Sequence, residues 1–388
     1  MSAAATADPA VPAVTTTPAA GPDRPDERPA YATLDGAGTA AILDAAGAPR
    51  WRAVQLRQAA FQQGAPDLAA VTILPRALRA ELDRRLRFQT LGHLASRVAD
   101  RGLTTKLLLR AADGESVETV AMTYPAAPDR RGRRTVCVST QIGCAIGCAF
   151  CATGQLGLRR QLEAAEIVDQ VRWAAWLWHR AGADPPSHVV FMGMGEPLQN
   201  LEATCGAVLA LGRFGIPPRR IVVSTSGVVP AIDRLTERGL GVTLALSLHA
   251  TDDRLRDRLV PLNRRWPIAA CLEAATRYAR TSGRRLTLEY VLIAGVNDQA
   301  EDARTLRRIA TTAHAHVNLI PMNRIPGSAW QAPAPAAARA FAAAVGQRAS
   351  LRFSRGDRAQ AACGQLRAEL DPPPERVERI RRRQGPPG

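Results

Sequence analysis

The residues Cys144-Ala-Ile-Gly-Cys148-Ala-Phe-Cys151, which follow the β-like segment Thr135-Val-Cys-Val-Ser-Thr140, decide the fold of this chain. Their three thiols form a C-x₃-C-x₂-C pattern and can converge on one soft metal centre. Fully ligated iron–sulfur clusters take four cysteines, and structural zinc takes four ligands. Three cysteines leave one coordination position empty, so the pattern predicts a centre that binds a further ligand.

Two simpler explanations of these cysteines are structural zinc and chance clustering. Zinc needs a fourth ligand nearby, and no His or Cys falls between Cys151 and His179. Chance is a poor explanation, because the chain has only 7 Cys and four of them lie between positions 137 and 151. A disulfide framework would need an even number of thiols and an oxidising compartment.

Length and composition describe a globular protein with a sizeable core. The chain has 388 residues, 46% of them hydrophobic, enough for one large α/β domain and a smaller one. No apolar run reaches the length of a membrane span, and the first thirty residues lack the features of a signal peptide. We therefore expect a cytoplasmic protein without membrane contact, whose thiols stay reduced and can bind a cluster.

The charge of the chain favours a polyanionic partner. The net charge is +16 and the isoelectric point is near 10.9, which is unusual for an enzyme that acts on a neutral metabolite. Lys106 is the only lysine, and such a bias is typical of a GC-rich genome. That bias explains arginine in place of lysine but leaves the excess of cations over Asp and Glu unexplained, so we predict a nucleic-acid partner.

The amino-terminal part divides into a leader and a helical region. Residues 1–30 are rich in Ala, Pro, Thr and Gly without periodicity, which predicts a disordered leader. Apolar residues then recur at helical spacing up to about residue 87, with interruptions at Gly64 and Pro75. We therefore predict a small helical RNA-binding accessory domain over residues 31–100.

Residues 104–124 change to the period of a β-hairpin. Two β-rich runs flank Asp113-Gly114, which is a strong hairpin-turn signal. A basic loop, Asp129-Arg-Arg-Gly-Arg-Arg134, then leads into the strand before the cysteines.

After Cys151 the chain alternates between helices and strands. The strands are near-continuous apolar runs, as in a parallel sheet covered on both faces. Seven strands with right-handed helical crossovers predict an α/β fold with a partial or complete (β/α) barrel over residues 101–370. Strands are expected at 135–140, 188–193, 220–225, 242–249, 286–293, 316–321 and 351–354, and helices at 163–181, 201–213, 229–238, 267–281, 298–313 and 334–347.

Polar residues gather where these strands end, which is where such barrels bind their ligands. Glycine lets the backbone approach a ligand closely, and Glu196 offers an acceptor for an ammonium group. A single polar residue at a strand end is usually satisfied by the backbone, so the group is more informative than any member. Its members are Glu196 after strand 188–193, Ser224 in strand 220–225, Ser247 and His249 in strand 242–249, and Asn318 and Asn323 in and after strand 316–321.

Four cysteines lie outside the motif. Cys205 and Cys271 fall inside predicted helices and are best explained as small core hydrophobes. Cys137 lies in the first barrel strand and Cys363 follows the last one. A barrel would bring those two ends together, and two thiols there could exchange a disulfide if their Cα atoms approach to about 6 Å.

The cysteine spacing resembles the cluster motif of the radical S-adenosylmethionine (SAM) enzymes. In that superfamily three thiolates hold a [4Fe–4S] cluster, and the open iron chelates the amino and carboxylate groups of SAM. Residues from about 104 to 367 further resemble the RlmN/Cfr family of radical SAM RNA adenine methyltransferases. The motifs that carry this resemblance are Val136-Cys-Val-Ser-Thr-Gln-Ile-Gly-Cys144, Cys151-Ala-Thr-Gly154, Phe191-Met-Gly-Met-Gly-Glu-Pro197, Ser224-Thr-Ser-Gly227, Ser247-Leu-His-Ala250, His316-Val-Asn-Leu-Ile-Pro321 and Ala361-Ala-Cys-Gly-Gln365.

The resemblance implies methylation of adenine C2 in 23S ribosomal RNA, with tRNA as a second substrate. In the family one SAM methylates the thiol that matches Cys363, and a second SAM is cleaved to a radical that takes a hydrogen from this methyl group. The resulting thiomethylene radical adds to the adenine. A base matching Glu118 then removes the ring proton, and the thiol matching Cys137 attacks the Cys363 sulfur to release product and leave a disulfide. Each turnover thus uses two SAM molecules.

The same resemblance implies ligand contacts and partners. An electron donor such as flavodoxin or ferredoxin is implied, and we expect a monomer. The basic residues within 130–134, and those from Arg379 to Arg383 in a basic Pro/Arg-rich tail at 371–388, would contact RNA phosphates. For Glu118 a surface glutamate is the ordinary alternative. The cluster ligands are Cys144, Cys148 and Cys151, and the residues expected to hold SAM are Gly195, Glu196, Ser224, Ser247, Leu248, His249 and Asn323.

Three other functions remain open. The segment Gly157-Leu-Arg-Arg-Gln-Leu162 ends in Gln-Leu, which resembles the Cfr-type enzymes that methylate adenine C8, whereas Asn-Leu is more usual in the C2 type. A non-catalytic iron–sulfur RNA-binding protein would not need Cys363. A radical SAM enzyme acting on a small metabolite fits the cysteine motif but leaves Cys137, Cys363 and the positive charge unexplained.

Overall fold

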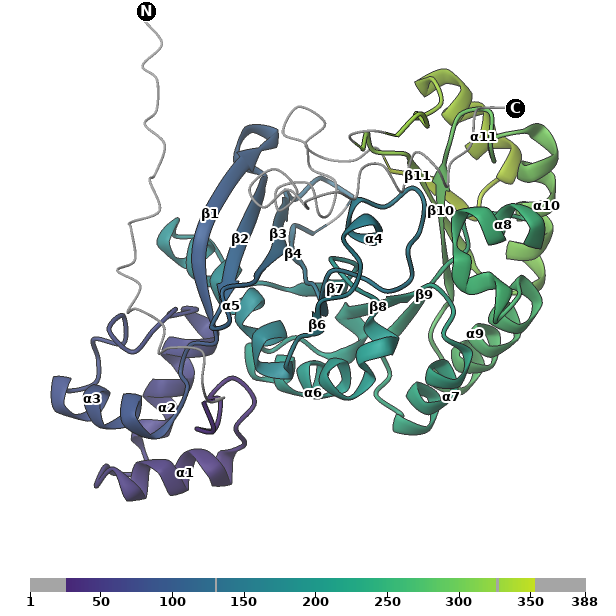
Figure 1. The fold of residues 1–388 in the computed structure, drawn as a ribbon. Coiled ribbons are helices and arrows are strands. Elements are labelled where there is room, and N and C mark those ends of the chain that lie inside the picture. Colours follow the sequence, from purple (N-terminus) through teal and green to yellow (C-terminus); the bar gives the residue numbers. More distant parts are fainter. Residues whose placement is uncertain (1–25, 130, 326–327, 353–388) are drawn as a thin grey trace, which may run out of the picture.

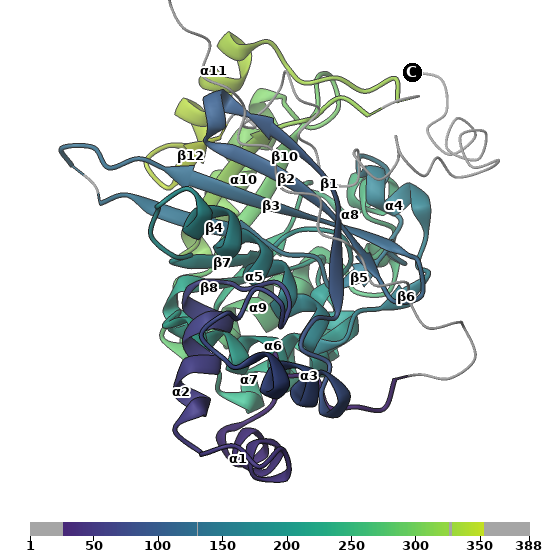
Figure 2. The same cartoon turned by 90° about the vertical axis from the view of Figure 1, so that its left-hand side faces the viewer.

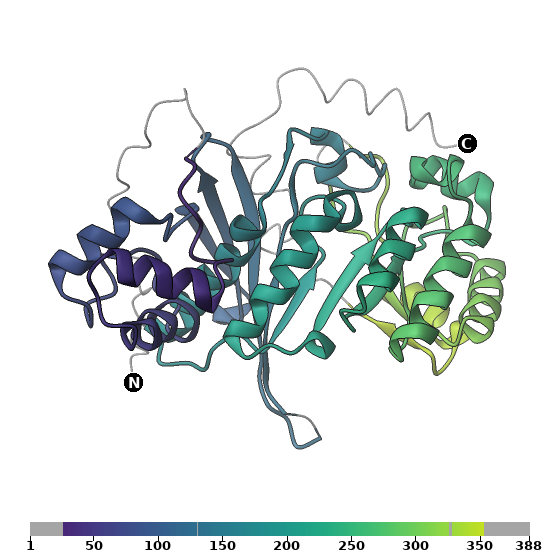
Figure 3. The same cartoon turned by 90° about the horizontal axis from the view of Figure 1, so that it is seen from below.

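The structure is a computed structural model that describes residues 26–129, 131–325 and 328–352 (Figure 1). Most of the predicted leader, the predicted tail at 371–388 and Cys363 lie outside the described residues. Figure 3 shows the amino-terminal helices and the carboxy-terminal helices at opposite ends of the sheet. No helix within the described ranges is long and apolar enough to cross a membrane.

The amino-terminal helices pack around a small aromatic core. They are α1 (Gly36–Ala45), α2 (Arg52–Arg57), the π-helical turn η1 (Gln58–Gln62) and α3 (Arg76–Arg85). Asp35 caps α1 by accepting a hydrogen bond from the Gly38 amide. The Tyr31 ring lies 5.7 Å from that of Phe61 and 5.3 Å from that of Phe88. These short helices agree with the spacing of apolar residues in the sequence.

A buried ion pair joins this helical region to α5 (Ala164–Arg180) of the barrel. Arg172 and Asp169 contact each other at 2.7 Å, and their side chains are 1% and 2% exposed. Arg172 also donates to the Phe88 and Ala65 carbonyls, and Asp169 accepts from the Thr90 amide. These contacts offset much of the cost of burying the two charges and link the amino-terminal segments to α5.

Ten strands form one open sheet in the order β1-β2-β3-β4-β7-β8-β9-β10-β11-β12. The first four pair antiparallel, and the pairs from β4 to β12 are parallel. The partial barrel is therefore confirmed, and a complete barrel does not form among the described residues. The strands are β1 (Leu91–Ala99), β2 (Thr104–Ala111), β3 (Ser116–Tyr124), β4 (Arg133–Cys137), β7 (His188–Phe191), β8 (Ile221–Thr225), β9 (Thr243–Ser247), β10 (Thr287–Leu292), β11 (His316–Pro321) and β12 (Ala349–Leu351).

Strand β1 differs from the prediction, which placed residues 91–99 in the helical region. The apolar residues of this segment follow neither the helical nor the strand period clearly. The segment forms a strand because it pairs along its length with β2. The predicted hairpin is confirmed as β2 and β3, with Gly114 in the turn at a φ of +83°. Because β3 pairs with β4, Cys137 lies inside the sheet and not at its edge.

Helices cover one face of the sheet (Figure 1). They follow the predicted positions to within a few residues, and α8 is an additional short helix in the connection after β9. The barrel helices besides α5 are α4 (Ala152–Leu156), α6 (Leu201–Leu211), α7 (Val229–Arg238), α8 (Asp253–Leu259), α9 (Ile268–Ser282), α10 (Ala300–Thr312) and α11 (Pro335–Val345).

The other face, here called the inner face, carries the side chains of Glu118 and Cys137. On β3 the Thr119 hydroxyl donates to Gln170 of α5, so Thr119 points toward the helices. Side chains alternate along a strand, so Glu118 and Val120 point to the inner face. Cys137 pairs with Val120 across β3 and β4, and paired residues share a face.

Candidate active site

The cysteine loop leaves β4 through a short ribbon of β5 (Gln141–Ile142) and β6 (Arg160–Gln161). The Cys144 amide donates to the Gly157 carbonyl at 3.0 Å, and the Ala149 amide donates to the Leu259 carbonyl at 3.0 Å. Gly143 has a φ of +80°, and a side chain there would overlap the Gly157 carbonyl. A glycine is therefore required directly before the first cysteine.

A second apolar cluster packs this loop against segments that follow β9, β10 and β11. Ile146 and Ala152 of the loop belong to it, and Cys144, Cys148 and Phe150 pack against it. The remaining buried members come from residues after β9, β10 and β11, namely Ala250, Leu259, Val260, Ile293, Met322 and Ile325. The three cysteines are thus held at the carboxyl ends of the parallel strands, where the sequence predicted the ligand site.

Two thiols of this loop, those of Cys144 and Cys148, are poor acids in the protein alone. Burial, with the neighbouring Cys151 as a second cause, raises the pKa of Cys144 to about 12. The same two causes raise the pKa of Cys148 well above its ordinary value. A bound metal supplies the positive charge that lets such thiols ionise, and thiolates suit iron–sulfur clusters. The donor set therefore fits a cluster.

The acidic, histidine and cysteine side chains are not arranged as a site for one metal ion in the parts of the chain that the structure describes. Within the described parts of the chain, no three or more His, Cys, Asp or Glu side chains converge tightly enough to hold one metal ion. The ligands of a polynuclear cluster bind different iron atoms and need not meet at one point.

The residues predicted to hold SAM lie in or directly after the strands β7, β8, β9 and β11. The ring of His249 lies 4.6 Å from that of Phe150 in an edge-to-face contact. The Ser224 and Ser247 hydroxyls lie 3.3 Å apart across β8 and β9. Gly195 and Glu196 follow β7, Ser224 lies in β8, Ser247 ends β9, Leu248 and His249 follow it, and Asn323 follows β11.

Glu196 is buried and already accepts backbone hydrogen bonds. Its carboxylate accepts from the Ser226 amide at 2.7 Å and from the Leu198 amide at 3.0 Å. Burial raises the pKa of this carboxyl, and the hydrogen bonds from these amides oppose the shift. Glu196 therefore links the ends of β7 and β8. Its carboxylate oxygens have further lone pairs, which can accept a hydrogen bond from a ligand ammonium.

Gly195 lies directly before Glu196 in a conformation that only glycine adopts easily. Its φ is +98°, and a Cβ there would lie 2.5 Å from the Cβ of Gln141. The Gln141 side chain in turn accepts from the Glu196 amide at 2.7 Å. The close packing of this glycine on Gln141 sets the direction in which Glu196 leaves β7.

His249 is neutral and has a defined tautomer. Burial, with a smaller effect of Arg256, lowers its pKa to about 3. Its Nδ1 accepts from the Val291 amide at 3.1 Å, so the ring proton lies on Nε2. His249 also has a φ of +61°, which is rare for a residue with a side chain. The site therefore holds a hydrogen-bond donor that carries no charge.

Arg256 is a site residue that the sequence analysis missed. It is fully buried on α8 and donates to the carbonyls of Ser226, Ser247 and Leu248 at 2.8 to 3.0 Å. Those three residues belong to the connections that carry the predicted SAM ligands. An arginine in a short, charged segment gives no sequence signal for this role, since exposed arginines share the same pattern.

Pairing across the sheet shows which predicted residues share the inner face. Cys137 is level with Val190, which pairs with Val222. Ser224 lies two residues after Val222 and shares its face, and Ser247, two residues after the partner of Ser224, pairs with Glu289. The inner face therefore carries Cys137 and both serines as well as Glu118. Cys363, the proposed partner of Cys137, lies outside the described residues.

The described part of the basic loop, Asp129 and residues 131–134, lies at the other end of the barrel. Strand β4 begins at Arg133 and runs toward the cysteine loop, so the loop precedes the amino ends of the parallel strands. Figure 2 shows the hairpin between β3 and β4 projecting from the sheet. Contact of these arginines with RNA stays a prediction, and it requires RNA that extends to the opposite end from the cysteines.

Glu289 is a buried acid on the inner face that the sequence analysis did not select. Its Oε1 accepts from Asn318 Nδ2 at 2.8 Å, and Ser350 Oγ donates to Asn318 Oδ1 at 2.9 Å. Burial raises the pKa of Glu289 to about 6, and the hydrogen bond from Asn318 opposes this shift. Glu289 pairs with Ser247 on the neighbouring strand, so the two side chains share the inner face.

Replacing Glu289 by glutamine is expected to stabilise the protein above pH 6. Because the folded state binds this proton more tightly than the unfolded state, the wild type should lose stability between pH 4.5 and about 6. Glutamine keeps the acceptor for Asn318 and has no proton to lose. Urea unfolding at pH 7 should show a gain of about 2 kcal/mol that shrinks toward zero below pH 4.5. An identical pH dependence in both proteins would contradict the shift.

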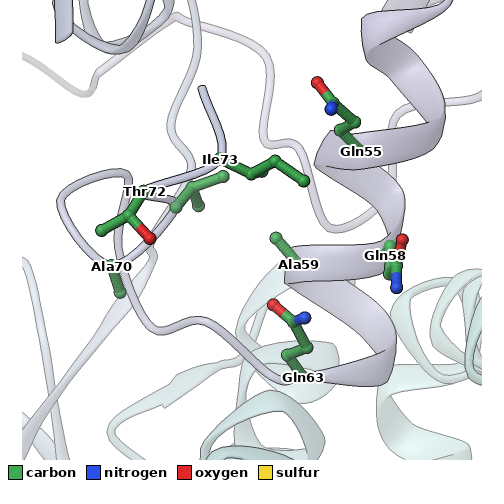
Figure 4. A pocket seen from close by; sticks show the side chains of 8 residues that line it. Gln55, Gln58, Ala59, Gln63, Ala70, Thr72 and Ile73 are labelled. Carbon is green, nitrogen blue, oxygen red and sulfur yellow. The ribbon is translucent and has the colours of Figure 1, made fainter. Parts of the chain in front are cut away.

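A cavity in the helical region is separate from this site. It has a volume of about 140 Å³ and lies between α2, η1 and the loop before α3 (Figure 4). Gln55, Gln58 and Gln63 line one side, and Thr72 and Ile73 line the other. None of the predicted site residues borders it.

Comparisons with known proteins agree with this geometry. Residues 138–306 match the Radical SAM superfamily. A Frankia alni protein named "Probable dual-specificity RNA methyltransferase RlmN" is 46% identical over 351 residues, covering 87% of this chain and 82% of the relative. A Moorella thermoacetica protein of the same name is 47% identical over 310 residues, covering 78% and 87%. The crystal structure of a radical SAM methyltransferase from Sphaerobacter thermophilus matches with a TM-score of 0.80 and 46% identity, covering 87% of this chain and 98% of that one.

Proposed function

The chain belongs to the RlmN family of radical SAM RNA methyltransferases, and we propose that it methylates C2 of an adenine in 23S ribosomal RNA, and in tRNA, through a methylated Cys363. The observation that carries this proposal is the common inner face of Glu118 and Cys137, at whose carboxyl-terminal edge the three-cysteine loop lies. A cluster that merely stabilised the fold would need neither a buried acid nor a buried thiol on this face.

The chemistry of the substrate explains why such a site is needed. Adenine C2 is an electron-poor ring carbon and cannot attack a SAM methyl group as a ring nitrogen would. A [4Fe–4S] cluster on Cys144, Cys148 and Cys151 would supply, together with SAM, the radical that overcomes this limit. Two SAM molecules are used in each turnover, one for the methyl group on Cys363 and one for the radical.

The residues of the chain then have distinct tasks. Glu118 would accept the ring proton, and the Cys137 thiolate would attack the Cys363 sulfur. The hydroxyls of Ser224 and Ser247 and the Nε2–H of His249 would bind polar groups of SAM. Gly195, Glu196, Leu248 and Asn323 complete the proposed SAM site at the same strand ends.

The proposed RNA partner agrees with the charge of the chain. A net charge of +16 supplies the sequence-independent attraction to phosphates that salt weakens. The target base would have to leave its stack to reach the inner face, as in other enzymes that modify bases. A flavodoxin or ferredoxin as electron donor, a monomeric state and a cytoplasmic location remain predictions from the sequence.

Product analysis tests the proposal directly. RNA from a strain that lacks the gene and from the complemented strain would be digested, and 2-methyladenosine and 8-methyladenosine would be separated by mass spectrometry. We expect 2-methyladenosine only after complementation with the active protein. The C8 product would favour the Cfr-type reaction, to which Gln161-Leu162 points, and the absence of both products would contradict both reactions.

A further inference from the structure

Lys106 is unusual both in composition and in position. It is the only lysine among the 51 Lys and Arg residues. All the others are arginine, so this position departs from the arginine bias of the chain. Its exposed fraction is 4%, although lysine is almost never fully buried unless it is paired. Both observations require a reason specific to this position.

The partner of Lys106 is the proposed base. Lys106 Nζ lies 3.4 Å from Glu118 Oε2, and the two side chains are 5% and 1% exposed. A buried ion pair is a weak way to stabilise a fold, because desolvation of both charges offsets most of their attraction. A buried pair that includes a reactive group is therefore better explained by the chemistry of that group.

The register of the sheet puts the pair beside Cys137. Lys106 on β2 is opposite Val120 on β3, and Val120 is opposite Cys137 on β4. Glu118 lies two residues before Val120 and shares its face. Lys106, Glu118 and Cys137 thus come from three adjacent strands and share the inner face.

We propose that Lys106 is a positioning residue for Glu118, and that its ammonium group holds this carboxylate in place and directed at the ring carbon during the proposed reaction. In the proton transfer from adenine to Glu118, the bond between C2 and its hydrogen breaks and an O–H bond forms on Glu118. The electron pair of the C–H bond stays in the ring, and the unpaired electron left there by radical addition would pass to the oxidised iron–sulfur cluster. This inference rests on the proposed function, because it concerns the same base and the same proton.

Lysine suits this task better than arginine. Its ammonium is a compact charge on a flexible stem and can follow a carboxylate that gains and loses a proton. The planar guanidinium of arginine instead holds a carboxylate in a fixed, paired geometry. Lys106→Arg should therefore keep the charge but recover only part of the function.

The test separates the steps of the reaction in the reconstituted holoenzyme. Lys106→Met, Lys106→Arg and Glu118→Gln would be compared with wild type, using RNA that carries deuterium at C2 of the target adenine. Three readouts are taken, namely methylation of Cys363, formation of 5′-deoxyadenosine and release of deuterium to solvent. Arg172→Met, which breaks a buried ion pair on helix α5 outside the inner face, controls for general loss of stability.

We expect Lys106→Met to slow deuterium release by about 10- to 100-fold, since general bases contribute this order of acceleration or more. Methylation of Cys363 and formation of 5′-deoxyadenosine should stay near the wild-type level. Lys106→Arg should lie between Lys106→Met and wild type. Deuterium release at the wild-type rate in Lys106→Met overturns the proposal, and so does an equal loss of all three readouts, as a purely structural role predicts.

A double variant keeps the proposal testable if Lys106→Met folds poorly. Lys106→Met with Glu118→Gln removes both charges, so neither is left buried alone. If Lys106 acts through Glu118, this double variant should release deuterium no more slowly than Glu118→Gln alone. An additive loss overturns the role of Lys106. If wild-type protein methylates RNA without releasing this deuterium, the proposed C2 reaction itself is wrong. An additive loss in the double variant contradicts only the role of Lys106, so the two failures can be told apart.

Discussion

Replacing Cys148 by serine is expected to abolish cluster binding and RNA methylation while the protein stays folded and binds RNA. A serine hydroxyl does not supply the soft thiolate that iron prefers, and the two remaining cysteines cannot hold the cluster alone. Serine is close in size to cysteine, so the loop should keep its packing on the second apolar cluster. Methylation should fall below detection, because the radical chemistry has no source in the protein.

Iron content and visible absorbance after anaerobic reconstitution measure the cluster, and mass spectrometry of digested RNA measures the methylated base. Cys205→Ser is the matched control, because Cys205 is buried on α6 outside the loop and should keep both the cluster and activity. A Cys148→Ser protein with a full complement of iron, or a control that loses as much, would contradict the assignment of the loop.

Local signals in the sequence were enough to predict the scaffold. The turn at Asp113-Gly114 and the alternation of apolar runs after Cys151 each depend on neighbouring residues, and the corresponding elements form where they were expected. The strand ends were also predictable, because parallel strands present their carboxyl ends on one side. The segment 91–99 was not, since only its pairing with β2 makes it a strand.

The contacts of Lys106 and Arg256 could not be predicted from the sequence, because they depend on how segments that are distant in the chain pair and pack. Lys106 reaches Glu118 only when β2 and β3 pair in the observed register, and a shift by one residue would turn the side chains of β2 to the other face. Arg256 donates to three carbonyls on two connections whose approach no local pattern encodes. The RNA contact predicted for the basic residues within 129–134 also depends on the fold, because β4 runs from Arg133 toward the cysteine loop, so RNA would have to extend to the opposite end of the barrel.

Alanine at Cys363 and alanine at Cys137 are expected to stop methylation at different points. Cys363→Ala removes the thiol that carries the methyl group, so no carbon should reach the RNA, although RNA binding should persist. Cys137→Ala leaves that carrier intact, so adenine should become attached to Cys363 through a CH₂–S linkage. Release then requires the Cys137 thiolate to attack the Cys363 sulfur. This attack forms an S–S bond, breaks the S–CH₂ bond, and leaves a carbon that takes a proton to become the methyl group.

Cys137→Ala should therefore accumulate a covalent protein–RNA adduct and make at most about one turnover, because the last bond cannot break. Denaturing gels reveal the adduct, and mass spectrometry of the nuclease-treated protein locates it on Cys363. Cys205→Ala, which removes a buried thiol from α6, should form no adduct. Retained RNA methylation in Cys363→Ala would favour a non-catalytic role for this cysteine. Free methylated product from Cys137→Ala over many turnovers would mean that another group resolves the linkage, even though Cys137 lies on the inner face with Glu118.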